Sequence, residues 1–225
     1  MSTLKTEGII LHTLKFKDTD QIATLFTPHE GLLKFFIKRA YTPKFGKGTA
    51  TALLSRAEFV YTKGKGDLYL CQEVTSLNTH PHLRANLPVL EASFDLLKGI
   101  LRTQMPQRAA HPLYQLLQTT LERIHTLPDP WSAALSLRLK ILRYEGVFHP
   151  TPFCSQCDNP LQEQYLHQGE SFCRAHAPHR ALEFSPDECA LLDHLAHARH
   201  WSELAITLPP GYALKVIQLF DDHFS

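Results

Sequence analysis

Short runs of β-branched and aromatic residues, separated by turn residues, dominate the first eighty residues of the chain. Such runs favour strands, and they predict strands at Gly8–Phe16, Gln21–Thr27, Leu32–Lys38, Leu54–Lys63 and Leu68–Ser76. Glycines in the intervening segments supply the positive backbone angles that tight turns need. About five short strands in this length predict a small closed barrel of the OB type. An SH3-like barrel would give almost the same pattern.

From Pro81 onward the apolar residues recur with helical spacing instead of alternating. Prolines punctuate the gaps, as they do at helix starts and linkers. The three apolar stripes are Leu87, Leu90, Phe94, Leu97 and Leu101; Leu113, Leu116, Leu117, Leu121 and Ile124; and Leu135, Leu139 and Leu142. These stripes predict a helical bundle.

Two further helices are predicted near the C-terminus. Ser185, Pro186 and Glu188 have the pattern of a helix start, with an N-cap, a first-turn proline and a capping-box glutamate. The stretch from Gly211 to Phe220 again has apolar residues, Leu214, Ile217 and Phe220, in helical step. We therefore expect an α+β protein: an N-terminal OB-fold β-barrel at 1–80, a helical bundle at 81–146, a small zinc-knuckle insertion at 147–182, and C-terminal helices packing on the bundle at 183–225.

The net charge of the chain conceals an asymmetry. Hydrophobic residues make up 44% and charged residues 20% of the 225 residues, which is typical of a globular protein. The net charge is only +1, but residues 1–80 carry 11 Lys and Arg against 7 Asp and Glu, and the remainder carries 12 against 15. The segment from Gly31 to Ala57 contains no acid. A local excess of cations suits a polyanionic partner.

Cations and aromatic residues alternate along this acid-free segment. Phosphates need cations, and unpaired bases can stack on aromatic rings. The candidate DNA-binding residues are Lys34, Lys38, Arg39, Tyr41, Lys44, Phe45 and Lys47. The alternative is that the cations are a solvated face and the aromatic residues belong to the core. For Phe35 and Ile37 we expect the core, because alternate residues of a barrel strand point inward.

Two knuckles of metal-ligand type lie in the insertion. Cys154 and Cys157 form one, and Cys173 and His176 form the other, separated by 15 residues. Two such turns can clamp one ion, and a closed Cys₃His set is one that tetrahedral zinc accepts. His167 and His179 lie nearby and could replace His176 as the fourth ligand.

Two alternatives to structural zinc stay open at this stage. The cysteines could be ordinary reduced thiols or a redox dithiol. A catalytic zinc would leave one coordination position open to water, whereas four ligands fill the shell. A deaminase would also have an H-x-E motif before P-C-x-x-C, and Phe153 separates Pro152 from Cys154 here. We expect zinc to stabilise the fold and not to catalyse a reaction.

Motifs for common enzymes are missing from the sequence. There is no G-x-x-x-x-G-K-[ST] phosphate loop, no G-x-S-x-G elbow and no H-E-x-x-H pair. His194, His197 and His200 are expected to be exposed helix histidines. We therefore predict no catalytic residue. The absence of a cationic-then-apolar leader and of a long apolar stretch predicts a cytoplasmic, nucleoid-associated protein without membrane contact.

The order of a basic barrel, a helical bundle and a knuckle pair before the last helices resembles the RecO family of recombination mediators over essentially the whole chain. Three local matches carry the resemblance. The first is Gly8 to Thr13 (GIILHT), followed by Asp18 to Asp20 (DTD), Leu25 to Thr27 (LFT) and Gly31. The second is Leu137 to Gly146 (LRLKILRYEG), and the third is the first knuckle at the expected distance after it. This chain departs from the family's usual sequence at two places. Family members often have a small glycine-containing basic turn at Lys38–Tyr41, and a cysteine at position 176.

The resemblance implies a function and a set of partners. It implies an OB-fold domain that binds single- and double-stranded DNA, anneals complementary strands without ATP, and helps to load the RecA recombinase onto coated DNA. It also implies RecR and the acidic C-terminal tail of single-strand-binding protein as partners, with the RecA–DNA filament contacted indirectly.

A site for the acidic tail is expected on the helical bundle. Arg138 and Arg143 flank leucines there and could form a cationic rim around an apolar pocket. The alternative is that both are solvated helix charges. Two rival functions also stay open: a protein–protein adaptor made of a barrel and a zinc site, and a zinc-dependent enzyme.

Overall fold

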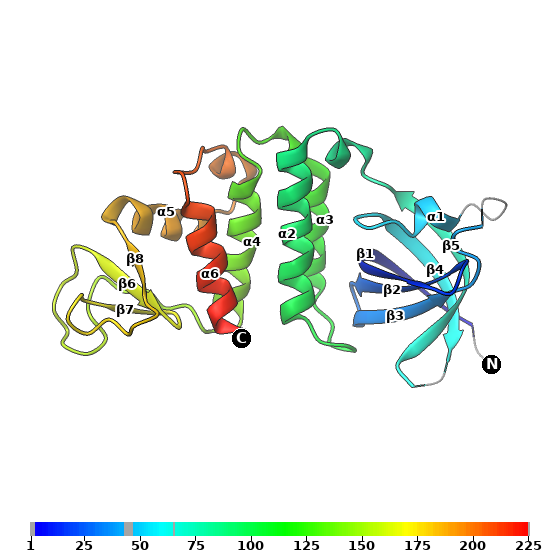
Figure 1. Ribbon diagram of the computed structural model, residues 1–225, viewed down its shortest axis with the longest axis horizontal. Helices are drawn as coiled ribbons and strands as arrows, with labels where there is room; N and C mark the ends of the chain where they lie inside the picture. The colour runs from blue at the N-terminus through cyan, green and yellow to red at the C-terminus, as the bar shows by residue number, and fades with distance from the viewer. Residues whose placement is uncertain (1–2, 43–46, 65, 225) are drawn as a thin grey trace. The chain divides into compact units, whose positions relative to one another are not determined.

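Five strands close into a barrel in the computed structural model of the chain (Figure 1). In the barrel wall, β3 and β5 pair in parallel, and the other neighbouring strands pair antiparallel. This OB-like barrel and the helices that follow it confirm the α+β fold class. The strands follow the order β1-β2-β3-β5-β4, with bounds β1 Leu4–Phe16, β2 Asp20–Thr27, β3 Gly31–Ile37, β4 Arg56–Lys63 and β5 Leu68–Asn78.

The structure describes residues 3–42, 47–64 and 66–224, without the side chain of Lys47. The chain divides into two compact units, Met1–His125 and Thr126–Ser225. Two of the helices expected within 81–146 belong to the first unit and one belongs to the second. A single bundle at 81–146 therefore stays a prediction.

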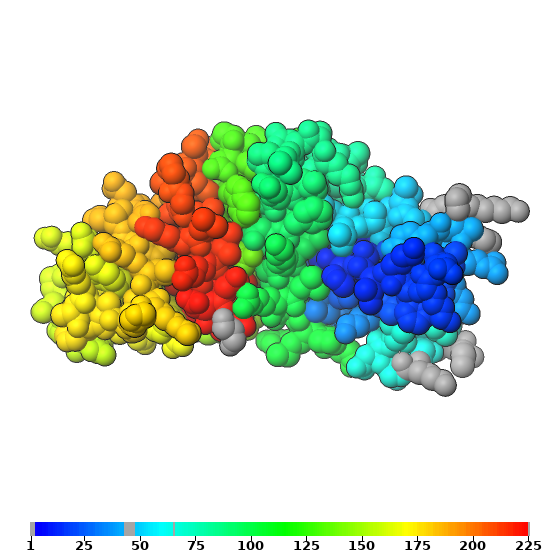
Figure 2. Space-filling model, viewed as in Figure 1, coloured from blue at the N-terminus to red at the C-terminus, as the bar shows by residue number. Residues whose placement is uncertain are grey.

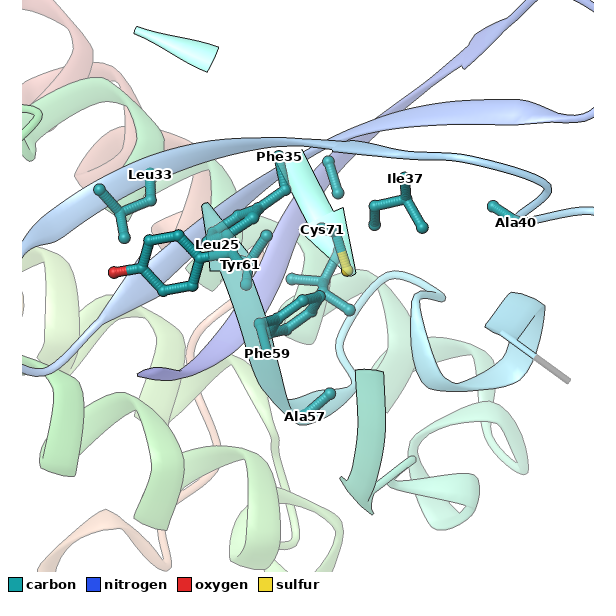
Figure 3. Packing of buried hydrophobic residues seen from close by; sticks show 11 residues of the cluster. Leu25, Leu33, Phe35, Ile37, Ala40, Ala57, Phe59, Tyr61 and Cys71 are labelled. Atoms are coloured by element: carbon teal, nitrogen blue, oxygen red, sulfur yellow. The ribbon is translucent and has the colours of Figure 1, made fainter. Parts of the chain in front are cut away.

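Alternation along the strands fills the barrel with apolar side chains. Figure 3 shows this core, in which odd-numbered residues of β2, β3 and β4 point inward. The ring of Phe35 lies 5.2 Å from that of Phe59 and 4.9 Å from that of Tyr61, measured between centroids. Phe35 and Ile37 are fully buried, as expected from the sequence. The same alternation sends the even-numbered residues of β2 and β3 to the outer face.

Two long helices belong to the same unit as the barrel. They are α2 (Leu87–Thr103) and α3 (His111–Arg123), and the short helices α1 (Lys47–Ala50) and η2 (Pro81–Arg84) precede them. Tyr114 of α3 packs on Phe26 of β2 with ring centroids 5.8 Å apart. Glu122 of α3 forms an ion pair of 3.9 Å with Arg56 of β4. These contacts fix α3 against the barrel wall.

The second unit is built around one buried helix. Helix α4 (Trp131–Tyr144) is buried from Ser132 to Leu139. The hydroxyl of Ser136 donates to the carbonyl of Leu195 at 2.8 Å, which joins α4 to α5. The remaining elements are η3 (Ile124–Thr126), which spans the boundary between the units, α5 (Pro186–His197), η4 (Trp201–Leu204), α6 (Tyr212–His223), and a sheet of order β7-β6-β8 made of β6 (Gln164–His167), β7 (Glu170–Phe172) and β8 (Leu182–Phe184).

The helices predicted from the sequence are present, with two partial errors. Leu214, expected on the apolar face of α6, is 72% exposed. The Leu87 side chain was expected on the buried stripe of α2, but it is 66% exposed because it lies at the first position of the helix. The sheet of the second unit was not predicted, because strands of three or four residues contain too few alternations to be recognised. None of the described helices combines the length and the apolar character needed to cross a membrane.

Candidate metal site and nucleic-acid interface

Three cysteines and one histidine come together in the second unit. The sulfur atoms of Cys154, Cys157 and Cys173 and a ring nitrogen of His176 all lie within 4.8 Å of one another. The Nδ1 atom of His176 is 3.3 Å from Sγ of Cys173 and 3.7 Å from Sγ of Cys154. Within the described part of the chain, this is the one group of potential ligands placed to hold a metal ion.

Each pair of potential ligands is held by a tight backbone turn. The amide of Asp158 donates to the carbonyl of Cys154 at 2.9 Å, and the amide of His176 donates to the carbonyl of Cys173 at 3.0 Å. The amide of Ser155 donates to the carbonyl of Ser171 at 2.9 Å, which ties the first turn to β7. The two-residue spacing therefore brings both members of each pair to the same point.

The environment of the cluster favours a thiolate at Cys154. Burial by itself raises the pKa of this thiol, but hydrogen bonds from the backbone amides of Cys173, Gln156 and Cys157 and from the ring of His176 lower the pKa to about 5. At Cys157 a hydrogen bond from the Asn159 amide favours the thiolate and by itself lowers the pKa. Burial and the neighbouring thiols outweigh this bond, so the pKa of Cys157 is raised. Several thiolates in contact repel one another, and a bound cation removes this repulsion.

The donor atoms fit a tetrahedral ion. Typical zinc–sulfur and zinc–nitrogen bonds place a sulfur and a nitrogen ligand about 3.5 Å apart, and the two distances from His176 Nδ1 lie on either side of this value. His176 is the histidine that joins the three cysteines, while His167 lies in β6 and His179 is exposed, both outside the cluster.

The cations predicted to bind DNA are exposed where the structure describes them. Lys34 lies on β3, and Lys38 and Arg39 follow that strand. The amide of Arg39 donates to the Asp20 carboxylate at 2.9 Å, and the positive φ of 55° at Arg39 turns the chain away from the strand. Tyr41 is 45% exposed. Lys44, Phe45 and the side chain of Lys47 lie outside the described residues.

A line of apolar side chains on the outer barrel face was not recognised in the sequence. Strand pairing places Leu14 opposite Ile22, Ile22 opposite Phe36, and Phe36 opposite Leu70. Phe16 joins this line through an edge-to-face contact with Phe36, with ring centroids 5.6 Å apart. We call these five residues the outer stripe. The sequence contained one signal for it. Several even-numbered residues of these strands are apolar, although the odd-numbered residues already supply the core.

A hollow of about 300 Å³ lies beside the outer stripe within the first unit. Lys34, His12 and Thr24, which occupy one register row across three strands, contribute to its lining. Asp67, Tyr69 and Gln107 are also among its lining residues. Leu32, Leu33, Leu101 and Pro106 complete the lining, so the basic face of the barrel continues into a concave surface of mixed polar and apolar character. The N-terminal strands, in blue, form part of the surface seen in Figure 2.

Arg138 and Arg143 both lie on α4 but differ in exposure. Arg138 is only 2% exposed, its Nη1 lies 3.6 Å from Oδ1 of Asp221, and its guanidinium lies 4.5 Å from the ring centroid of Phe220. Arg143 is exposed and donates to the carbonyl of Ala196 at 2.9 Å. Arg138 therefore stabilises the packing of α4 against α6, and Arg143 is the member of the pair at the surface. The partner-binding role of the pair stays a prediction.

Known proteins match the chain over nearly its whole length. The family model described as "Recombination protein O N terminal" matches residues 1–80, and "Recombination protein O C terminal" matches residues 82–221. A protein of Chlamydia pneumoniae named DNA repair protein RecO is 30% identical over 217 residues, which cover 95% of this chain and 86% of the relative. A protein of the same name from Chlamydia muridarum is 26% identical, and the match covers 88% of this chain and 85% of that protein. Another from Moorella thermoacetica is 27% identical, and the match covers 69% of this chain and 58% of that protein.

The barrel, the helices and the Cys₃His cluster define an α+β protein whose N-terminal barrel is OB-like and whose C-terminal unit contains a potential metal site. The two family models together cover more than half of the chain. The chain belongs to the RecO family of DNA repair proteins.

Proposed function

We propose that this chain is a non-catalytic recombination mediator. It binds single- and double-stranded DNA through the barrel, anneals complementary strands without ATP and, with RecR, helps to load RecA onto DNA coated by single-strand-binding protein. Membership of the RecO family supports the role in DNA repair. The observation that carries DNA binding is the exposure of Lys34, Lys38 and Arg39 together on and after β3 of an OB-like barrel.

Annealing in this proposal is passive. Cations neutralise the phosphates of two strands at the same time, which removes the repulsion that keeps the strands apart. Base pairing then supplies the free energy, so that no nucleotide is hydrolysed. The protein accordingly acts in the cytoplasm at the nucleoid.

Strand annealing without ATP tests the proposal. The change is to replace Lys34, Lys38, Arg39, Lys44 and Lys47 with alanine, and the measurement is the rate at which complementary oligonucleotides anneal. We expect the wild type to anneal and the variant to fail. Because each cation that contacts a phosphate of single-stranded DNA contributes about 0.7 to the slope of log affinity against log salt, the variant should also show a weaker salt dependence of binding.

The control replaces Lys98, an exposed residue of α2, and Arg199, an exposed residue of the second unit, both of which lie outside the barrel strands. This control should anneal as well as the wild type. Binding that ignores salt, or annealing that requires nucleotide hydrolysis, would contradict the proposal. A wild type that binds no DNA at low salt would favour the protein–protein adaptor instead.

We also propose that Cys154, Cys157, Cys173 and His176 hold a structural Zn²⁺. The contacts between these donors and their tetrahedral spacing support this assignment. Zinc bound there supplies the charge that keeps the thiolates deprotonated and together. The bound ion would stabilise both turns. It would also stabilise the β6–β8 sheet, because the first turn is hydrogen-bonded to Ser171 of β7.

The acidic tail of single-strand-binding protein is proposed to bind near Arg143. The exposed guanidinium on α4 can pair with a carboxylate of the tail. Arg138 would act there by holding α4 against α6. Titration of a tail peptide against Arg143→Ala tests the contact, and unchanged affinity would exclude it.

A further inference from the structure

The outer stripe is an exposed apolar surface. Leu14, Phe16 and Leu70 are 55%, 39% and 40% exposed, and Phe36 and Ile22 are half-buried between them. Scattered apolar side chains on a surface need no explanation, but a contiguous apolar patch marks a binding surface. Strand pairing makes these side chains contiguous, because four neighbouring strands each contribute one to a single line.

The two aromatic rings of the stripe are arranged to accept a further ring. Phe16 and Phe36 meet edge to face, with an angle of 85° between their planes. In this geometry the edge of one ring covers one face of the other, so ring faces remain available for stacking. The ammonium of Lys17 lies 5.7 Å from the ring centroid of Phe16.

The charges that border the stripe are mostly positive. Lys34 and Lys38 lie two residues before and after Phe36, and the ammonium of Lys17 lies over the ring of Phe16. The acids nearby are Asp18, Asp20 and, in the hollow beside the stripe, Asp67. The Asp20 carboxylate accepts hydrogen bonds from the Arg39 amide and the Thr19 hydroxyl. The border therefore suits a ligand that is apolar in the middle and anionic at its edges.

We propose that the outer stripe is a stacking surface for the unpaired bases of single-stranded DNA. The inference rests on the proposed DNA binding by the barrel and extends it. A duplex hides its base faces, whereas both forms of DNA expose their phosphates. The cations therefore attract either form, and the outer stripe adds affinity for the single strand alone. This would let the barrel hold a separated strand until its complement arrives.

The shape of the surface favours nucleic acid over a protein partner. Four strands about 4.8 Å apart give a line about 14 Å long, which can contact several consecutive bases but is one side chain wide. Lys34 and Lys38 lie on opposite sides of the line at Phe36, where they can reach the phosphates of a strand lying on the stripe. A protein interface instead has an apolar centre depleted in charge.

The test compares single-stranded and duplex DNA in the full-length protein. The variant is Phe16→Ala with Phe36→Ala, and the readout is fluorescence anisotropy of labelled oligo-dT and of a labelled duplex hairpin. Because stacking on one aromatic residue is worth about fivefold or more in affinity, we expect the loss of both rings to weaken oligo-dT binding by at least about tenfold. Duplex affinity should change by less than about twofold, and the salt dependence should not change, since no cation is removed.

Leu77→Ala is the matched control, because Leu77 is an apolar residue of β5 that is 43% exposed and lies outside the outer stripe. It should leave both affinities unchanged. Circular dichroism and thermal unfolding verify that the double variant is folded. If it is not, Phe16→Ala alone, at the end of β1, is expected to weaken oligo-dT binding about fivefold.

A gain of function gives an independent measurement. Leu14→Trp adds a larger ring at an exposed position of the stripe, so it should tighten oligo-dT binding, and its fluorescence should be quenched by the bases. An unchanged oligo-dT affinity in the folded alanine variant would overturn the stacking proposal while DNA binding by the wild type still stood. An equal loss for both forms of DNA would overturn it too. A wild type that binds neither form would overturn the proposed function together with this inference.

Discussion

His80 is a buried histidine at the junction between the barrel and the helices of the first unit. It is fully buried, and its Nδ1 lies 2.8 Å from the carbonyl of Leu54. Its ring centroid is 5.8 Å from that of His82. Burial lowers the pKa of His80; the Leu54 carbonyl and Glu122 act in the opposite direction, and His82 and Arg56 lower the pKa further. The ring is therefore neutral at pH 7.

The lowered pKa of His80 predicts that acid destabilises the first unit. Between the pKa of the folded state and the unfolded value of about 6.5, the unfolded chain binds a proton that the folded chain does not. The free energy of unfolding should therefore fall as the pH drops below about 6.5. Urea unfolding followed by circular dichroism at pH 7.5, 6.5 and 5.5 measures this change.

The variant His80→Gln should show a weaker dependence on pH, because it removes the titrating group and can still donate to the Leu54 carbonyl. His149→Gln in the second unit serves as the control, since it removes a histidine that is exposed. The same pH dependence in His80→Gln and in the wild type would show that other groups cause the effect.

Helix α5 is the element whose beginning is most fully determined by local sequence. The Ser185 hydroxyl accepts the Glu188 amide at 3.2 Å, and the Glu188 carboxylate accepts the Ser185 amide at 2.9 Å. Glu188 also pairs with Lys215 of α6 at 2.7 Å. The capping box therefore both begins α5 and holds it against the next helix.

Ser185→Ala should lower the free energy of unfolding of the second unit by about 1 kcal/mol, the usual cost of losing an N-cap side chain. Chemical denaturation followed by tryptophan fluorescence measures it, because the two tryptophans, Trp131 and Trp201, both lie in this unit. Ser202→Ala, at an exposed serine of η4, should cost much less. An equal cost for both variants would mean that the cap contributes nothing.

The elements differ in how far the sequence could predict them. The five barrel strands and α5 have strong local signals: strands of seven to thirteen residues rich in β-branched and aromatic residues, and a four-residue capping motif. The strands β6 to β8 have three or four residues each, so neither alternation nor composition distinguishes them from loop. Their order follows from pairing between residues far apart in the chain, such as Gln164 with Phe184.

At the scale of the whole molecule, the candidate metal site belongs entirely to the second unit. Removal of a structural metal should therefore destabilise residues 126–225 without unfolding the barrel. We expect a chelator to lower the midpoint of thermal unfolding followed by tryptophan fluorescence, since both tryptophans report on this unit. Elemental analysis should find one zinc per chain.

Variants of the ligands sharpen this prediction. Cys154→Ser should lose the metal, whereas His176→Cys should retain it, since zinc accepts a fourth thiolate. Cys189→Ser is the control, because Cys189 lies outside the cluster. Full zinc content in Cys154→Ser would refute the proposed site, and an unfolding midpoint unaffected by the chelator would refute the structural role.

The sequence by itself determined the class of fold and the candidate ligands, because both depend on short-range features. Alternation specifies a strand and its inner face, and the spacing of Cys154 from Cys157 and of Cys173 from His176 specifies two turns that each aim two donors. The tertiary structure alone decided what depends on neighbours from other strands and helices. Packing against α6 buried Arg138, and strand register aligned Leu14, Phe36 and Leu70 into one surface. No local pattern encodes which residues of distant strands face each other, since register follows from closing the whole barrel.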